Sequence, residues 1–207
     1  MKTKLNAQVV RHIYLFILLV VLVLVYPPTR IFFSTIGERW LYIMSLSFAL
    51  SFCLTPLFRF IALRWNVVDR PDTRKVHKQA TPLLGGAAVF ISFVVAILVN
   101  DVFTVKLFAI LGGSFILFIL GIWDDTWGVS ASIRLLFQVL STVLVMCFGI
   151  VLHTMPDSLG FFAQVSNWVL TFLWIVGITN AMNFFDGMDG LAAGLGAIVS
   201  FFLGIIA

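Results

Sequence analysis

The sequence predicts an all-α, polytopic integral membrane protein with about seven spans, and three observations lead to this fold class. Of its 207 residues, 61% are hydrophobic and only 11% are charged, and the mean hydropathy of +1.11 exceeds that of a soluble globular chain. Apolar runs long enough to cross a bilayer recur along the chain. Most charged side chains fall in a few segments between these runs.

The apolar runs give the expected elements in order. A spanning helix needs roughly 20 mostly apolar residues, and helices are expected because lipid offers the backbone no other partners. The first run follows a basic start and resembles a secretion signal, but the residues from Val25 to Pro28 make a poor cleavage site, so we expect an uncleaved span. Cys53 and Cys147 lie within such runs, without paired spacing, and are expected to act as small hydrophobic residues. The expected spans cover residues 9–26, 40–63, 83–100, 105–123, 134–153, 166–183 and 190 to the end.

Basic residues orient these spans. Successive connections alternate between the two sides of the membrane, and with the N-terminus inside, most of the 13 Lys and Arg residues also lie inside. Only Arg30, Arg39 and Lys106 fall outside. The net charge of +4 is therefore a signal of topology, and no nucleic-acid partner is expected. We expect a multi-pass protein of the cytoplasmic membrane with its active face in the cytoplasm.

Three polar segments face the cytoplasm in this topology: residues 64–86, 121–138 and 180–190. They carry most of the 9 acidic residues of the chain. An acid at mid-membrane costs about 2.5 to 3.5 kcal/mol on insertion scales, so such residues usually face protein or a water-filled cleft. Their grouping on one face of the membrane indicates a site there.

Two groups of polar side chains follow apolar runs in these segments. Asp124 and Asp125 are helix neighbours that diverge by about 100°, so one can serve a reacting group while the other orients a base or a metal-bound water. Asn183, Asp186 and Asp189 are spaced by three, which predicts a polar arc along one side of a helix. With basic groups opposite, this pattern favours a phosphate ester bound with Mg²⁺, which takes one or two carboxylates and phosphate oxygens. The basic residues expected opposite are Arg74, Lys75, His77, Lys78 and Arg134.

Each of these residues also has a simpler explanation. Asp124 could be a helix-end acid in interfacial water, and Asp186 could cap the next helix. The cations could reflect only the inside-positive bias, with His77 a solvated loop histidine and Arg134 a residue that extends its charge to the interface. The hypothesis of a shared site depends on all the unusual residues lying on one side of the membrane.

Three motifs resemble those of the polyprenyl-phosphate N-acetylhexosamine-1-phosphate transferases of glycosyltransferase family 4, which start lipid-linked assembly of cell-envelope polysaccharides. The motifs are VDRPDTRKVHKQATPLLGG at residues 68–86, GIWDDTWGVSASIRLLFQ at residues 121–138 and NAMNFFDGMDGLAAG at residues 180–194. The resemblance covers the chain from about Trp40 to its end. The pattern is closer to the undecaprenyl-phosphate GlcNAc-1-phosphate transferase branch than to the peptidoglycan branch.

The resemblance implies transfer of a sugar 1-phosphate, expected to be GlcNAc-1-phosphate, from a UDP-HexNAc to polyprenyl phosphate, with release of UMP and with Mg²⁺, or alternatively Mn²⁺, as cofactor. Lipid acceptor and soluble donor would meet at the cytoplasmic interface, aligned for in-line attack. Membrane lipid is an expected partner, and a homodimer is an open alternative. By the same resemblance, Asp124 and Asp125 are catalytic, Asn183 and Asp186 hold the metal, and the substrate-binding residues are Arg74, Lys75, His77, Arg134, Asn180 and Asp189.

The chain departs from this family in several places. Arg134 stands where many relatives have Lys, which keeps the charge but changes the geometry. The family fold has about ten to eleven spans of roughly 20 residues each, with a third acidic motif and a histidine-rich loop that do not occur before Ala207. We therefore expect a fragment or a truncated reading frame that is inactive alone. Residues 1–39 are expected to form an additional span and outer loop, and residues 40–207 the N-terminal portion of the transferase membrane domain.

Two other function classes stay open. A membrane transporter or channel is the main alternative, because polar residues beside glycine-rich helix breaks also mark substrate paths. A purely structural subunit is the second. The sequence lacks the signature of the CDP-alcohol phosphotransferases, a different class of membrane phosphotransferase.

Overall fold

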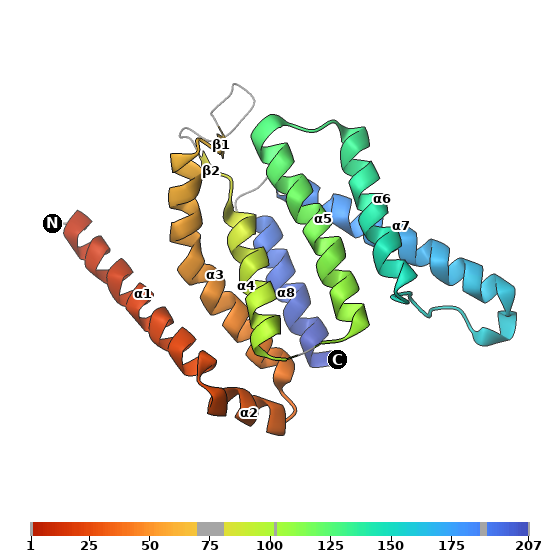
Figure 1. Ribbon diagram of the computed structural model, residues 1–207, viewed down its shortest axis with the longest axis horizontal. Coiled ribbons are helices and arrows are strands. Elements are labelled where there is room, and N and C mark those ends of the chain that lie inside the picture. The colour runs from red at the N-terminus through yellow and green to blue at the C-terminus, as the bar shows by residue number, and fades with distance from the viewer. Residues whose placement is uncertain (1, 70–80, 102, 187–189, 207) are drawn as a thin grey trace. The chain divides into compact units, whose positions relative to one another are not determined.

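The computed structural model describes residues 2–69, 81–101, 103–186 and 190–206. Within these ranges the chain forms eight α-helices, one short 3-10 helix and one pair of two-residue strands (Figure 1). By length and composition, 4 of the helices can cross a membrane, and three shorter ones are also apolar. The all-α, polytopic fold class predicted from the sequence is confirmed. The chain divides into two compact units.

The first unit comprises Met1–Val102 and Ile122–Gly128. Its core is made by Tyr42, Leu46 and Ala49, which are buried on one helix against a buried alanine of the next. Small residues at such a crossing let two helices approach closely. The helices of this unit, in chain order, are α1 (Lys2–Val25), α2 (Pro27–Thr35), α3 (Arg39–Arg64) and α4 (Gly85–Val99), and α3 packs against both α1 and α4 (Figure 1).

Helix α2 lies where the sequence predicted only an outer loop. Two prolines occupy its first positions, where a missing backbone N–H leaves no hydrogen bond unmade. Arg30 of α2 donates through one terminal nitrogen to the carbonyl oxygen of Val99 at 2.7 Å and to Oδ2 of Asp101 at 2.5 Å. The connection between α1 and α3 therefore meets the end of α4 at one end of this unit.

A short strand pair marks the other end of α3. The strands β1 (Val68–Asp69) and β2 (Thr81–Pro82) pair antiparallel, and the backbone N–H of Leu83 adds a bond to the carbonyl of Val67 at 3.3 Å. The helix α5 (Val105–Trp127) contributes its last residues to this end. A buried cluster supports the pair, made of Ala62, Val67 and Leu84, with Ile122 packed against it.

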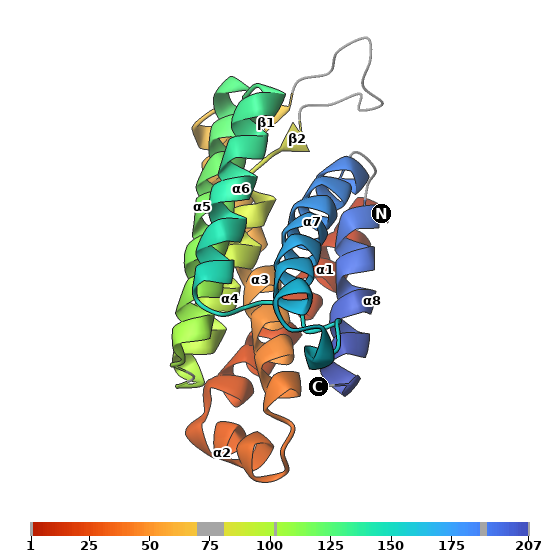
Figure 2. The same cartoon turned by 90° about the vertical axis from the view of Figure 1, so that its right-hand side faces the viewer.

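The second unit comprises Phe103–Gly121 and Val129–Ala207. It holds the larger part of α5 and the chain that follows. Helix α8 contacts α7 and returns beside it (Figure 2). The remaining elements, in chain order, are α6 (Ala131–Cys147), the 3-10 helix η1 (Asp157–Leu159), α7 (Phe161–Phe185) and α8 (Leu191–Ile206).

Helices α5 and α6 approach closely at a glycine. A Cβ atom at Gly113 would lie 2.8 Å from Cγ2 of Val145 and 3.0 Å from the hydroxyl oxygen of Ser141. That hydroxyl donates to the carbonyl oxygen of Gly113 at 3.0 Å. The crossing thus combines a small residue with an interhelical hydrogen bond, which are the two devices that hold helices together in lipid.

Helix α6 ends at Cys147, earlier than the predicted span over residues 134–153. Gly149 adopts a φ of 80°, and the chain then leaves the helix. The following backbone groups find buried acceptors on α7: Leu152 N–H donates to Oγ1 of Thr171 at 2.9 Å, and the N–H groups of Thr154 and Met155 donate to Oδ1 of Asn167 at 3.1 and 3.0 Å. These acceptors replace the helical hydrogen bonds, so apolar composition alone overestimates the helix.

Polar and apolar residues are distributed as lipid requires. Phe48 is 68% exposed, and Phe60 and Trp174 are similarly exposed, whereas Ser92 and Thr142 are buried. Each of these two hydroxyls donates to a carbonyl of its own helix, at 2.6 and 2.8 Å. Exposed aromatic side chains with hydrogen-bonded hydroxyls inside are typical of helices whose surroundings are apolar.

Gly113→Ala is expected to lower the free energy of unfolding by about 1 to 3 kcal/mol, because the added methyl group overlaps Val145 and Ser141. The measurement is thermal or denaturant-induced unfolding of the purified protein in one detergent. Gly112→Ala is the matched control, since its Cβ would meet Leu144 at an ordinary 3.7 Å. Equal losses at the two positions would contradict the close approach of α5 and α6.

Candidate functional site

Asp124 and Asp125 lie in the last turn of α5. Asp124 is half-buried and Asp125 is exposed, as expected for helix neighbours that point in different directions. Gly128 has a φ of 71°, and its N–H donates to the carbonyl oxygen of Asp124 at 2.9 Å, which ends the helix. Carboxylates are disfavoured at a helix C-terminus, where the helix dipole is negative, and the last turn of α5 contains no basic residue. Helix stability therefore does not explain this acidic pair.

The C-terminal end of α5, which carries the two aspartates, packs near the strand pair that flanks the basic segment, residues 70–80. We call this strand pair the base of the basic segment. Ile122, two residues before Asp124, packs on the buried cluster that supports β1 and β2. These strands flank residues 70–80 and hold the two ends of that segment together. The first unit thus brings the paired aspartates to the point where the basic segment begins and ends. The predicted substrate-binding residues Arg74, Lys75 and His77 belong to this segment and lie outside the described residues.

Asn183 and Asp186 lie at the C-terminal end of α7. Both side chains are exposed, and Asp186 is the C-cap, with its N–H donating to the carbonyl of Met182 at 3.1 Å. An amide and a carboxylate three residues apart fall on the same side of the helix end. As on α5, the acid lies where the helix dipole is negative, which favours a cation.

The alternative that Asp186 caps the next helix is wrong. Helix α8 begins at Leu191, and Gly190, with a φ of 75°, precedes it. The glycine permits a sharp change of chain direction that residues with a Cβ rarely adopt. Asp189, predicted to bind substrate, lies outside the described residues.

The donor set at the end of α7 fits Mg²⁺. In the described part of the chain, no group of three His, Cys, Asp or Glu side chains is close enough to hold a metal ion. Mg²⁺ does not need such a group, because it prefers oxygen, takes one or two carboxylates and completes its shell with waters and substrate phosphates. Asn183 and Asp186 supply one amide oxygen and one carboxylate of this kind.

Asn180 connects two helices. Its Nδ2 donates to Oε1 of Gln138 on α6 at 2.7 Å and to the carbonyl of Val176 at 2.9 Å. Gln138 is buried. The sequence predicted a substrate contact for Asn180 and did not select Gln138, although this residue ends the second motif. The signal available in the sequence was a lone amide in an otherwise apolar stretch of α6.

Arg134 lies in the first turn of α6, where the helix dipole disfavours a cation. It is half-buried, and its Nε donates to the carbonyl oxygen of Val129 at 3.2 Å. This bond holds the side chain toward the connection between α5 and α6.

The described site residues fall in both units. Asp124 and Asp125 belong to the first unit, and the second contains Arg134, Asn180, Asn183 and Asp186. Within the first unit, the aspartates lie near the strand pair that flanks residues 70–80. Within the second unit, Asn180, Asn183 and Asp186 lie toward the C-terminal end of α7. The convergence of these groups at one site stays a prediction.

Comparisons with known proteins give a consistent result. Residues 107–207 match glycosyl transferase family 4. A probable undecaprenyl-phosphate N-acetylglucosaminyl 1-phosphate transferase of Bacillus subtilis is 40% identical over 153 residues, which cover 70% of this chain and 42% of that protein. A decaprenyl-phosphate N-acetylglucosaminephosphotransferase of Mycolicibacterium smegmatis is 33% identical, over 73% of this chain and 41% of that protein. An undecaprenyl-phosphate alpha-N-acetylglucosaminyl 1-phosphate transferase of Thermotoga maritima is 32% identical, over 75% of this chain and 48% of that protein.

The chain spans less than half the length of these relatives. No solved structure matches it.

Asn180→Leu is expected to lower the free energy of unfolding by about 1 to 3 kcal/mol, because the buried amide of Gln138 loses its partner. Asn183→Leu, an exposed amide on the same helix, is the control and should change it by less than about 0.5 kcal/mol. Unfolding in detergent measures both. The double variant Asn180→Leu with Gln138→Leu should recover part of the loss, since neither polar group then stays buried alone. A purely additive double variant would argue against the interhelical hydrogen bond.

Proposed function

We propose that this chain, which belongs to glycosyl transferase family 4 through its residues 107–207, is part of an enzyme that transfers GlcNAc-1-phosphate from a UDP-sugar to polyprenyl phosphate and releases UMP. The observation that carries the proposal is the attachment of the acidic end of α5 to the base of the basic segment. Acids near the two ends of a segment whose sequence is rich in cations suit two phosphate substrates and a divalent cation. The names of the relatives support the lipid acceptor and the transferred sugar phosphate.

The length of α5 suits a reaction at the membrane boundary. Its 23 residues rise about 35 Å, more than the roughly 30 Å of a hydrocarbon core. Measured from Val105, Asp124 and Asp125 lie about 28 to 30 Å along the helix axis, so a helix of this length carries them to the edge of the hydrocarbon. The phosphate of a polyprenyl acceptor lies at the same depth, since its chain is in lipid and its head is in water. A soluble sugar nucleotide can reach that depth from one side only.

The two aspartates have separate roles in this proposal. Asp125 is exposed, so its carboxylate takes the proton of the acceptor phosphate or positions that phosphate for attack. Asp124 is half-buried, so its carboxylate orients the groups around its neighbour. Attack by the acceptor oxygen on the sugar-linked phosphorus forms the new pyrophosphate bond and breaks the bond to UMP. In-line alignment of these oxygens supplies much of the rate.

The remaining predicted residues bind phosphate and metal. Asn183 and Asp186 would hold Mg²⁺, which when bound offsets the charge that develops on the pyrophosphate. Asn180 positions the end of α7 through Gln138. The side chains assigned to the phosphates and the sugar nucleotide are Arg74, Lys75, His77, Arg134 and Asp189.

The orientation of the chain follows from its charge. With the three polar segments on the cytoplasmic side, the positive-inside rule is satisfied and the nucleotide donor has access. We place the protein in the cytoplasmic membrane on this basis. Initiation of a cell-envelope polysaccharide is the role that such a reaction would serve.

Asp124→Asn and Asp125→Asn are each expected to lower turnover about 10²-fold or more, because a neutral amide neither accepts a proton nor balances a cation. The assay follows Mg²⁺-dependent release of UMP from a UDP-HexNAc in the presence of polyprenyl phosphate, with the longest product of the gene.

Asp157→Asn is the matched control for these variants, because it neutralises an exposed acid of η1 on the opposite connection. It should leave turnover unchanged. Turnover equal to that of the unmodified protein in a folded Asp124 or Asp125 variant would contradict the proposal.

Single cysteines are expected to show the orientation of the chain. In a background without Cys53 and Cys147, a membrane-impermeant maleimide applied to intact cells should label Ser158→Cys and not Ser130→Cys. Both positions are exposed in the fold, so both should react after permeabilisation. Labelling of Ser130→Cys from outside would contradict the cytoplasmic site and would favour a transporter, whose polar path opens to both sides.

A further inference from the structure

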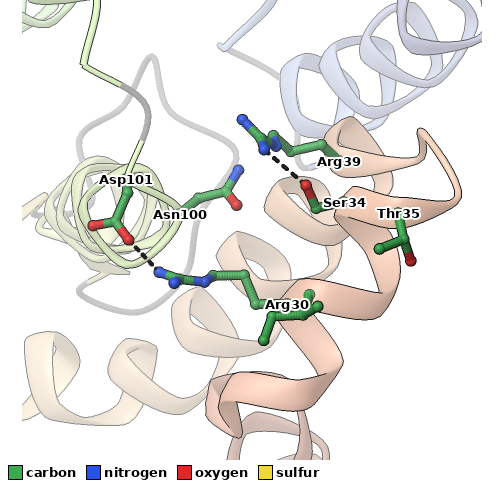
Figure 3. Close-up of a pocket in the computed structure, with 7 residues that line it drawn as sticks. Arg30, Ser34, Thr35, Arg39, Asn100 and Asp101 are labelled. Atoms are coloured by element: carbon green, nitrogen blue, oxygen red, sulfur yellow. Dashed lines mark hydrogen bonds and ion pairs between the residues drawn. The ribbon is translucent and has the colours of Figure 1, made fainter.

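A polar cleft lies at the end of the first unit that is remote from the strand pair. Its volume is about 230 Å³, and side chains from α2, from the start of α3 and from the end of α4 surround it (Figure 3). This is smaller than the roughly 300 to 1,000 Å³ of clefts that hold drug-sized ligands. The polar residues that line it are Arg30, Ser34, Thr35, Arg39, Asn100 and Asp101.

The cleft has an excess of positive charge. Arg30 is paired with Asp101, the one carboxylate among the lining residues. Arg39 donates through a terminal nitrogen to the hydroxyl of Ser34 at 2.8 Å and forms no ion pair within the described ranges. Glu38 precedes Arg39 but does not line the cleft. The lining therefore holds two guanidinium groups and one carboxylate, a charge balance that favours an anion over a cation.

A buried donor in the cleft lacks an acceptor. Asn100 is 5% exposed, and its side-chain nitrogen forms no hydrogen bond with any described residue. Its backbone N–H is satisfied by the carbonyls of Ala96 and Ile97, so only the side chain is unpaired. Leaving such a buried donor unmet destabilises the fold, unless a bound group accepts the hydrogen bond. A stabilising ion pair between Arg30 and Asp101 would not require this amide.

Helix α2 gives the cleft an apolar border. Ile31 lines the cleft and is exposed, and the neighbouring Phe32 is 58% exposed. A short helix with apolar side chains on one face and arginine nearby is typical of segments that lie in the headgroup region of a bilayer. Since α2 follows the first span and precedes the second, the membrane boundary is the depth at which it must lie.

We propose that this cleft binds a phosphate group at the membrane boundary, with Arg39 and the amide of Asn100 as donors and Arg30 as a charged neighbour. Guanidinium, amide and hydroxyl groups match the several acceptor oxygens of a phosphate. The apolar border of α2 suits a phospholipid headgroup, and free phosphate offers the same oxygens. The site is separate from the proposed transfer reaction and does not depend on it.

The test uses the purified chain and no sugar nucleotide. In detergent, thermal unfolding is followed with inorganic phosphate and with chloride at equal ionic strength. In parallel, unfolding in nanodiscs of phosphatidylglycerol is compared with unfolding in nanodiscs of an uncharged, bilayer-forming lipid that lacks phosphate. Stabilisation by phosphatidylglycerol alone assigns the site to a lipid headgroup, and stabilisation by both probes assigns it to phosphate groups in general. If neither inorganic phosphate nor phosphatidylglycerol stabilises the chain, the proposal is overturned.

Three variants identify the cleft as the place of binding. Arg39→Gln and Asn100→Leu are each expected to weaken binding of the effective probe about 10-fold, as loss of one charged or buried donor predicts. Asp101→Asn is expected to strengthen it, because it removes the only carboxylate of the cleft. Asp101 has a φ of 52°, a conformation that asparagine also tolerates, so the backbone is kept.

The ligand-free proteins supply the folding control. Asn100→Leu should not destabilise the chain without ligand, because it removes an unmet donor. If Arg39→Gln or Asp101→Asn leaves the probe effect unchanged while the variants stay folded, binding occurs elsewhere and the proposal is wrong.

Discussion

A polar group in lipid must find its partner within the protein, and this constraint governs the fold. The hydroxyl of Tyr42 donates to the carbonyl of Leu24 at 2.9 Å, which joins α3 to α1. The Ser141 hydroxyl joins α6 to α5 in the same manner, and the Asn180 amide joins α7 to α6. Helices packed in lipid gain little from the hydrophobic effect, so a few such bonds and small residues at crossings select how they pair.

The same constraint collects ionisable groups at helix ends. Asp124 and Asp186 each lie where a helix exposes its last carbonyl groups, a position that the helix dipole makes less favourable for an acid. Within the first unit, the end remote from Asp124 holds Arg30 and Arg39 beside a buried amide. The two ends therefore differ in the sign of the ligand they suit. A transferase with an acceptor in the membrane needs the first kind of end, and the second kind suits contact with anionic headgroups.

Much of the fold could be predicted from the sequence because apolar runs mark most of the helices, although the end of α6 did not follow from its apolar run. The positions of Asp124 and Asp125 at a helix end also followed from the apolar run before them. Helix α2 could not be predicted in this way, since it is held by a contact between Arg30 and Asp101, which are far apart in the sequence. Likewise, the strand pair depends on a cluster buried beneath it, and the partner of Asn180 depends on the register between two helices. These features require three-dimensional contacts that no local pattern encodes.

Helices α6 and α7 exchange hydrogen bonds or receive them from their own connection toward both ends of the hairpin that they form. Asn167 and Thr171 accept the backbone N–H groups of the connection at one end, and Gln138 meets Asn180 toward the other. In lipid, either helix alone would leave polar groups such as the amides of Gln138 and Asn167 without these partners. Helices α6 and α7 therefore depend on each other to satisfy these groups in lipid.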